Sequence, residues 1–107
     1  MAFQIGAGLL DACVLAVLAR GDTYGYNLTH QVREMMEISE STLYPVLRRL
    51  QRDGYLTTYD SAFQGRNRRY YTLTDSGRTR CGEFQDEWRA FRHMIDHILL
   101  REEESDE

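Results

Sequence analysis

Residues 41–77 read STLYPVLRRLQRDGYLTTYDSAFQGRNRRYYTLTDSG, and this stretch decides the fold. Leucines at 43, 47 and 50 share one helical face, and the glycine at 54 is a typical helix stop. Two runs rich in aromatic and β-branched residues follow, 55–60 and 69–73, separated by a turn at 63–67. A helix followed by a basic hairpin is typical of a winged helix-turn-helix, which places a helix in the DNA major groove and a charged loop beside the backbone. We therefore expect a mainly α fold with a small β-hairpin (α+β).

Pro45 limits where this helix begins. A proline fits within the first turn of a helix, where its missing N–H is not needed. The sequence therefore favours Ser41 or Thr42 as the N-cap. If Ser39 is the cap instead, the helix should bend at Pro45.

Charge is unevenly distributed along the chain. The formal net charge is −4, yet residues 102–107 carry five of the seventeen acidic residues. Residues 1–101 carry thirteen basic and twelve acidic residues, a balance of +1, and residues 42–80 alone reach +5. All thirteen basic residues are arginine, whose side chain can bind phosphate or guanine as a bidentate fork. Positive charge gathered at the predicted helix and turn favours a nucleic-acid partner over an ordinary solvated surface.

Two helices are predicted before this stretch. Residues 7–19 are apolar nearly all round, so they require burial on more than one side, and the second side can be a partner subunit. Thr23 can cap a second helix over residues 24–36. We expect Tyr24 and Tyr26 to pack between these two helices.

The last helix is predicted over residues 75–101 with Thr74 as its cap. Its apolar residues alternate in steps of three and four, as in the seam of a coiled coil. Because this seam extends beyond what a small core can cover, we expect a homodimer rather than a helix packed only on its own domain. The predicted interface comprises Leu9, Leu10, Cys13, Cys81, Phe84, Trp88, Phe91, Ile95 and Ile98. We divide the chain into a winged helix-turn-helix DNA-binding domain (1–74) and a dimerisation helix with a frayed acidic tail (75–107).

The cysteines and the N-terminal apolar run bear on the compartment. Cys13 and Cys81 lie far apart on apolar helix faces and are interpreted as small buried side chains in a reducing compartment. The apolar run of residues 5–19 is too short to span a bilayer, contains Asp11 and lacks the basic start of a signal peptide. The sequence therefore predicts a cytoplasmic chain with no membrane partner.

Several short pieces of sequence carry a resemblance to a known family. In chain order they are Tyr24-Gly25-Tyr26, Thr42-Leu43-Tyr44-Pro45, Leu47-Arg48-Arg49-Leu50, Asp53-Gly54-Tyr55-Leu56, Arg69-Tyr70-Tyr71-Thr72-Leu73-Thr74-Asp75-Ser76-Gly77 and Glu87-Trp88. Together they resemble the PadR family of transcriptional regulators over roughly residues 9–100. The single C-terminal helix is similar to the short branch of that family.

The resemblance implies a homodimeric cytoplasmic repressor whose first and last helices form the interface and whose third helix enters the major groove. It also implies that a small aromatic or drug-like effector relieves repression. Trp88 corresponds to a tryptophan that, in the multidrug-responsive branch, sandwiches flat ligands with its symmetry mate. Whether Trp88 stacks a ligand or only packs the interface stays open, because buried tryptophan is ordinary in interfaces.

The predicted DNA contacts lie on the third helix and in the hairpin turn. Polar side chains and backbone N–H groups at the start of the helix can meet phosphates and base edges. The candidates are Ser41, Thr42, Tyr44, Arg48, Arg49 and Arg52 on the helix, and Gln64, Arg66 and Arg68 in the wing. The helix arginines span different faces, so one or two of them should pair with acids instead. Two such heads in a dimer match a pseudo-palindromic operator in double-stranded DNA.

Other functions have weaker support in the sequence. His93 and His97 have a spacing that suits a metal pair, but the residues between them lack the glutamate of a zinc-hydrolase motif. No nucleophile stands beside a base and no glycine-rich phosphate loop is visible, so we expect neither an enzyme nor a cofactor. A winged helix used only for protein binding is a further alternative, and the arginine cluster argues against it.

Overall fold

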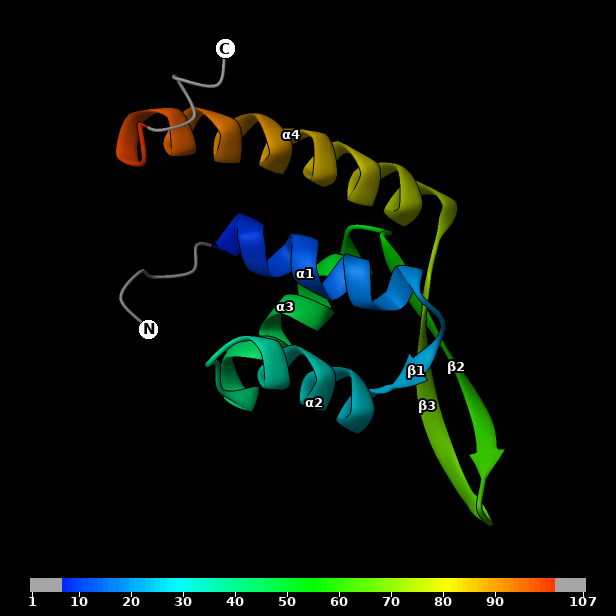
Figure 1. The fold of residues 1–107 in the computed structure, drawn as a ribbon. Helices are drawn as coiled ribbons and strands as arrows, with labels where there is room; N and C mark the ends of the chain where they lie inside the picture. The colour runs from blue at the N-terminus through cyan, green and yellow to red at the C-terminus, as the bar shows by residue number, and fades with distance from the viewer. Residues whose placement is uncertain (1–6, 102–107) are drawn as a thin grey trace.

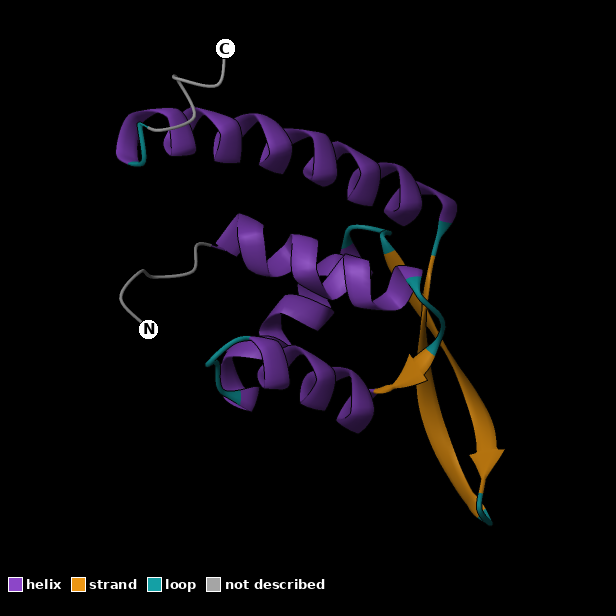
Figure 2. Ribbon diagram, viewed as in Figure 1, coloured by secondary structure: helices purple, strands orange, loops and turns teal. Residues whose placement is uncertain are grey.

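The computed structural model describes residues 7–101. The acidic tail predicted at 102–107 and the first two residues of the apolar run at 5–19 lie outside this range. Helices and a small sheet alternate along the chain (Figures 1 and 2). The elements are α1 (Ala7–Ala19), β1 (Thr23–Tyr24), α2 (Gly25–Met35), α3 (Glu40–Arg52), β2 (Leu56–Phe63), β3 (Arg66–Leu73) and α4 (Asp75–Leu99). The predicted fold class, a winged helix-turn-helix followed by one long helix, is confirmed.

The helix α1 is buried on several sides, as its nearly continuous apolar sequence predicts. Val14 and Leu15 are fully buried, and α1 contacts α2, α3, α4 and β3. Figure 1 shows it between α4 and the α2–α3 pair. The rest of the core comes mainly from Leu28, Val32, Leu43, Val46, Leu47, Leu50, Leu56 and Leu73. Because burying each such side chain contributes roughly 1.5–3 kcal/mol, this core fixes which face of α3 points outward.

The sheet has three strands where the sequence predicts two. Its strand order is β1-β3-β2, and Thr23 and Tyr24 of β1 pair with Tyr71 and Tyr70 of β3. The N-cap of α2 is therefore Tyr24, and the predicted cap, Thr23, is buried in the sheet. The Thr23 hydroxyl accepts a hydrogen bond from the Asn27 side chain (2.7 Å). A two-residue strand has too few alternating side chains to leave a pattern in the sequence.

The N-cap of α3 is Ser39, so the preferred caps Ser41 and Thr42 are wrong. The Ser39 carbonyl accepts hydrogen bonds from the backbone N–H groups of Thr42 (3.1 Å) and Leu43 (3.2 Å). The helix is thus already formed before Pro45, which lies inside it and removes one backbone hydrogen bond. Ser39, the alternative cap, is the one observed.

The start of α4 is hydrogen-bonded to the turn that follows α3. The Thr74 hydroxyl accepts a hydrogen bond from the Gly77 N–H (3.0 Å), which confirms Thr74 as the N-cap. The same hydroxyl donates to the carbonyl of Gly54 (2.7 Å). A Cβ at Gly77 would overlap the carbonyl oxygen of Tyr55, so the close approach requires glycine. Figure 1 shows α4 running back along α1 to its end at Leu99, two residues before the predicted end.

Candidate nucleic-acid interface

The start of α3 presents a cluster of hydroxyl groups. Ser39 Oγ lies 3.0 Å from both Ser41 Oγ and Thr42 Oγ1, and all three residues are exposed. Tyr44 follows on the same helix and is 39% exposed. The first turn of a helix also has backbone N–H groups without helical partners. Hydroxyls and free N–H groups gathered at a helix N-terminus suit phosphate oxygens and base edges.

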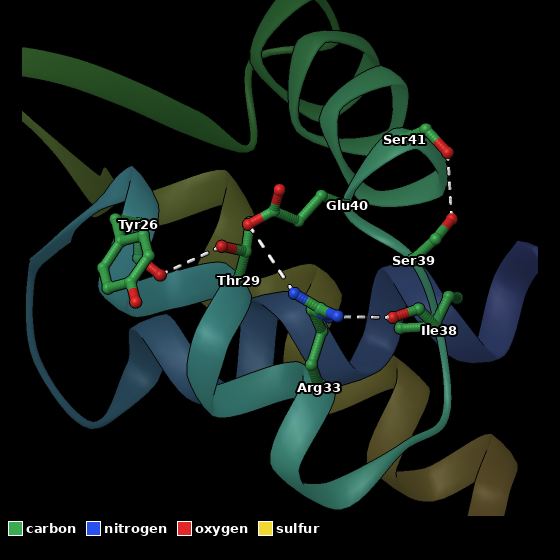
Figure 3. A network of polar contacts seen from close by, with 7 residues as sticks. All are labelled: Tyr26, Thr29, Arg33, Ile38, Ser39, Glu40 and Ser41. Atoms are coloured by element: carbon green, nitrogen blue, oxygen red, sulfur yellow. Dashed lines mark hydrogen bonds and ion pairs between the residues drawn. The ribbon is translucent and has the colours of Figure 1, made fainter.

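Arg33 links the last turn of α2 to the first turn of α3 (Figure 3). Its Nε donates to the carbonyl of Ile38 (3.1 Å), and one terminal nitrogen lies 3.6 Å from the Glu40 carboxylate. Figure 3 also shows the Thr29 hydroxyl, which donates to the carbonyl of Tyr26 (2.9 Å) within α2. The Arg33 contacts hold the hydroxyl cluster in a set position relative to α2. Sequence reasoning missed Arg33, because a bond to a backbone carbonyl demands no particular residue type in return.

The three helix arginines differ in what they contact. Arg49 forms a bidentate ion pair with Asp11 of α1 (2.8 and 2.7 Å), and these hydrogen bonds raise the pKa of its guanidinium. Arg52 lies 3.5 Å from Asp53 and keeps 73% of its side chain exposed. Arg48 is exposed. As the sequence predicts, one or two of these arginines pair with acids, and Arg49 is the one that bridges α3 to α1.

The β2–β3 hairpin forms the wing, and its turn is shorter than predicted. Gln64 and Gly65 join the strands with positive φ values of 52° and 76°. A two-residue turn with positive φ at both positions fits the twist of a hairpin. Asn67, predicted to lie in the turn, pairs with Ala62 in the sheet. Gln64 and Arg66 are exposed at the tip, where a duplex can be reached.

Arg68 differs from its neighbours in the wing. It is half-buried, and its guanidinium carbon lies 4.4 Å from the centre of the Tyr24 ring and 5.4 Å from that of Phe63. Tyr24 thus packs against the wing, whereas the sequence led us to place it between α1 and α2. Tyr26, expected in the same place, is 65% exposed.

On the other side of the molecule, α1 and α4 expose an apolar surface. Two adjoining hollows of about 580 and 310 Å³ lie between these helices, and both are lined by Leu9, Ala12, Phe84 and Trp88. Along α4 and just beyond it, the exposed large apolar residues are Trp88, Phe91, Met94, Ile98, Leu99 and Leu100. We call these residues and the two hollows the apolar surface.

The predicted interface residues fall into two groups. Leu10 and Cys81 lie in the core of the chain, at 3% and 5% exposed, and Cys81 also lines the smaller hollow. The others lie on or beside the apolar surface or farther along α4: Leu9, Cys13, Phe84, Trp88, Phe91, Ile95 and Ile98. Both cysteines are free thiols, and burial raises the pKa of each.

The two histidines of α4 bear on metal binding, and the helices bear on membrane insertion. The rings of His93 and His97 lie 6.4 Å apart on α4, and residues 7–101 hold no group of three or more metal-binding side chains. Among the helices described, none combines the length and apolar character needed to cross a membrane.

Known proteins share the sequence pattern and the architecture of this chain. The profile of the "Transcriptional regulator PadR-like family" matches residues 14–83. The chain belongs to the PadR family. The crystal structure of smu.1704 from Streptococcus mutans UA159 is similar with a TM-score of 0.86 and 39% identity, over 92% of this chain and 93% of that one. A PadR family regulator from hypervirulent Clostridium difficile R20291 has a TM-score of 0.79 and 31% identity, over 84% of this chain and 97% of that one.

A PadR protein that is named as a negative regulator is also similar to this chain. The negative transcriptional regulator PadR of Bacillus subtilis strain 168 is 32% identical over 76 residues, which cover 65% of this chain and 41% of that protein. The chain is therefore a transcriptional regulator, and its family consists of regulators rather than enzymes. The PadR profile covers the helix-turn-helix, the wing and the first turns of α4. The residues from Phe84 onward, including Trp88, lie beyond it.

Proposed function

We propose that this PadR-family regulator is a homodimeric repressor that binds a pseudo-palindromic DNA operator and is released by a small planar aromatic effector. The observation that carries the proposal is the set of exposed polar groups at the start of α3 together with the exposed tip of the wing. In this arrangement α3 enters the major groove and the wing lies along the backbone or a minor groove.

The proposed DNA contacts are the candidate residues whose side chains are exposed. Ser41, Thr42 and Tyr44 meet phosphates and base edges, because they project from the N-terminal turns of α3 and are exposed. Arg48 and Arg52 reach phosphates or guanines, since neither is held in a bidentate pair. At the wing tip, Gln64 and Arg66 contact the backbone.

The apolar surface supports the homodimer. An isolated chain would expose Phe91 at 52%, Ile98 at 63% and Leu99 at 65% along one helix. Contiguous apolar patches of this kind mark protein interfaces. A second copy, related by a two-fold axis, would cover this surface and place two heads on successive half-sites about one DNA turn apart, or a multiple of it. The repressor sign is supported by the similar Bacillus subtilis protein, whose name is that of a negative regulator.

The hollows beside Trp88 support an effector site. The larger has a volume of about 580 Å³, within the range of small-molecule pockets, and Leu9, Ala12 and Phe84 line it with Trp88. Trp88 is 44% exposed, so its indole is available to stack on a planar molecule. The competing role is that Trp88 only packs against the second copy of the chain.

The DNA-binding part is tested by footprinting on the promoter next to the protein's own reading frame. We expect protection of two half-sites related by pseudo-symmetry, and mobility shifts that weaken steeply as salt rises. Protection without symmetry would remove the homodimer from the proposal. A failure to retain any duplex in dilute salt would remove DNA binding.

The effector part is tested by fluorescence, since Trp88 is the single tryptophan of the chain. We expect planar aromatic dyes to quench its emission and to weaken operator binding at the same concentrations. A Trp88→Leu variant should dimerise and bind DNA while its operator complex no longer responds to the dye. Absence of quenching across a broad panel of dyes would leave Trp88 with a packing role only.

A further inference from the structure

We infer that Arg68 acts as a positioning residue for DNA binding, because the rings of Tyr24 and Phe63 hold its guanidinium and thereby fix the direction of the wing. This inference rests on the proposed DNA-binding function. It gives Arg68 a different role from Arg66, although both are wing arginines in a chain whose sequence offers no reason to separate them.

The outer half of the wing has only two strands. The third strand, β1, pairs with β3 only at Tyr71 and Tyr70. Beyond this point β2 and β3 continue as a two-stranded ribbon from Asp60–Arg69 to Phe63–Arg66. An isolated two-stranded hairpin is marginal in water. The tip therefore needs a further contact with the body if it is to point in one direction.

Arg68 supplies that contact from the first free part of the ribbon. Arg68 lies two residues from Tyr70 along β3, on the side of the wing tip, so the two side chains share a face of the sheet. The Arg68 guanidinium returns toward the body and lies 4.4 Å from the ring centre of Tyr24, the N-cap residue of α2. On the β2 side it lies 5.4 Å from the ring centre of Phe63. The Arg68 guanidinium thus lies between the end of the wing and the start of the helix-turn-helix, where the Phe63 and Tyr24 rings also meet with their centres 6.1 Å apart.

The surroundings of Arg68 fit a ring-held cation better than a free phosphate ligand. Its Nε is buried and has no hydrogen-bond partner within residues 7–101. A guanidinium can lie in such a place because it is weakly hydrated and stacks on aromatic faces. Arg66 and Arg69, by contrast, are exposed.

A wider row of rings continues the same face toward the body. The Tyr24 and Tyr70 rings meet edge to face at 5.7 Å, and the Tyr59 ring stacks on Tyr70 at 5.5 Å. The Tyr59 hydroxyl donates to Asp22, before β1 (2.8 Å). The inner half of the wing is therefore already fixed, and Arg68 extends this support outward.

The test separates the charge of Arg68 from its ring contacts. Tyr24→Leu removes the ring under Arg68 and keeps every charge, whereas Arg68→Lys keeps the charge and loses most of the stacking. We expect each variant to weaken operator binding about 3- to 10-fold, with the wild-type slope of log affinity against log salt. The double variant should be little weaker than either single one. Tyr24→Phe, which keeps the ring, should bind as the wild type does.

Arg66→Ala serves as the matched control, because it should lower the salt slope by about one contact. If Arg68→Ala also lowers the slope and Tyr24→Leu binds normally, Arg68 is a phosphate contact and the inference is overturned. Thermal unfolding followed by circular dichroism identifies any variant that fails to fold; should Tyr24→Leu be one of them, Arg68→Lys still tests the ring contact.

Nuclear magnetic resonance tests the ring contact without DNA. We expect the side-chain methylene protons of Arg68 to be shifted upfield by the rings, and this shift to shrink in Tyr24→Leu, where only the Phe63 ring remains. Its absence in the wild type would overturn the inference even if the protein binds its operator. If the shift is present but the wild type retains no duplex, the proposed function fails, and the positioning role fails with it.

Discussion

The two sides of this PadR-family chain expose opposite chemistry. At the start of α3 and the tip of the wing, the exposed residues include hydroxyls, an amide and arginines, which water solvates well, beside one large apolar ring, Phe63, at 40% exposed. Along α1 and α4, the exposed residues include Trp88, Phe91 and Ile98, between 44% and 63% exposed. The first side is stable in water without a partner, whereas the second side has an unmet requirement for burial.

This difference implies a one-way dependence. Binding of DNA should depend on the apolar surface, whereas the apolar surface should not depend on DNA. The apolar surface can be covered by a second chain whether or not DNA is present. In the proposed homodimer, the side formed by the start of α3 and the wing tip, here called the DNA-binding side, gains two half-sites only when the apolar surface has paired two heads, because linked heads bind as one unit. Damage to the apolar surface should therefore reach the DNA, and damage to the DNA-binding side should leave the dimer intact.

The largest effect is expected from Phe91→Glu, which places a charge in the middle of the apolar surface. Burying an unpaired carboxylate is costly, so the protein should become monomeric at micromolar concentration. Operator affinity should fall at least about 100-fold, because each head then binds alone. Sedimentation velocity and mobility shift on the same samples measure both effects.

His93→Glu is the matched control for Phe91→Glu. It introduces the same acidic side chain two positions along α4, on the face of the helix opposite to Phe91. This variant should remain dimeric and bind the operator normally. A dimeric Phe91→Glu protein, or a monomeric one that keeps full affinity, would break the proposed dependence of DNA binding on the apolar surface.

A smaller effect is expected at the bridge between the two sides, where Arg49 of α3 meets Asp11 of α1. Arg49→Met leaves the Asp11 carboxylate without its bidentate partner, although Asp11 is only 14% exposed. Discounted for the partial exposure of Arg49, the loss should lower the free energy of unfolding by about 1–2 kcal/mol. Chemical denaturation measures this loss, and Asp11→Leu combined with Arg49→Met should recover much of it.

Arg48→Met, one residue away, provides the contrast. Arg48 is exposed, so its loss should change the unfolding free energy by less than about 0.5 kcal/mol. It should instead weaken DNA binding and lower the salt slope, which Arg49→Met should leave unchanged. Equal salt slopes for the two variants would contradict their assignment to different roles.

Elements with a strong local pattern were predictable from the sequence. The bounds of α1 at residues 7–19, the helix stop at Gly54 and the cap at Thr74 were all found as predicted. Each follows from periodicity or from a residue type whose conformation is restricted. The family and the winged helix-turn-helix followed from the same stretches.

What the sequence could not supply were the contacts that long-range packing decides. Nothing in the pattern distinguishes Arg49, held by Asp11, from Arg48, which is exposed. The strand β1 was missed because two residues carry no periodicity. Tyr24 was placed between helices because an aromatic residue at a helix start fits several neighbours, and only the sheet shows that its neighbour is the wing.

Within the DNA-binding side, substitutions of Arg66 and of Thr42 should affect DNA binding in different ways. Arg66→Ala removes an exposed wing charge, so it should weaken operator and unrelated DNA alike by about 3- to 10-fold and lower the salt slope by about one. Thr42→Ala keeps the charge and removes a hydroxyl at the start of α3. It should reduce the preference for the operator and leave the salt slope as it is. Competition binding at several salt concentrations measures both quantities, and the same salt slope for Arg66→Ala as for the wild type would remove Arg66 from the phosphate contacts.

The smallest effect concerns Cys13, a half-buried thiol that lines the smaller hollow of the apolar surface. Burial raises its pKa, so the thiol stays protonated at neutral pH and alkylation should be slow. The rate should rise about tenfold per pH unit through the ordinary titration range of a thiol, because the reactive thiolate forms only at higher pH. If a second chain covers the hollow, Phe91→Glu should speed the labelling of Cys13 several-fold. Cys81 lines the same hollow but is only 5% exposed, so its labelling should stay slow in both proteins. Mass spectrometry of iodoacetamide-treated protein resolves the two sites. Labelling of Cys13 at equal rates in the wild type and in a monomeric Phe91→Glu protein would mean that the second chain leaves this hollow open.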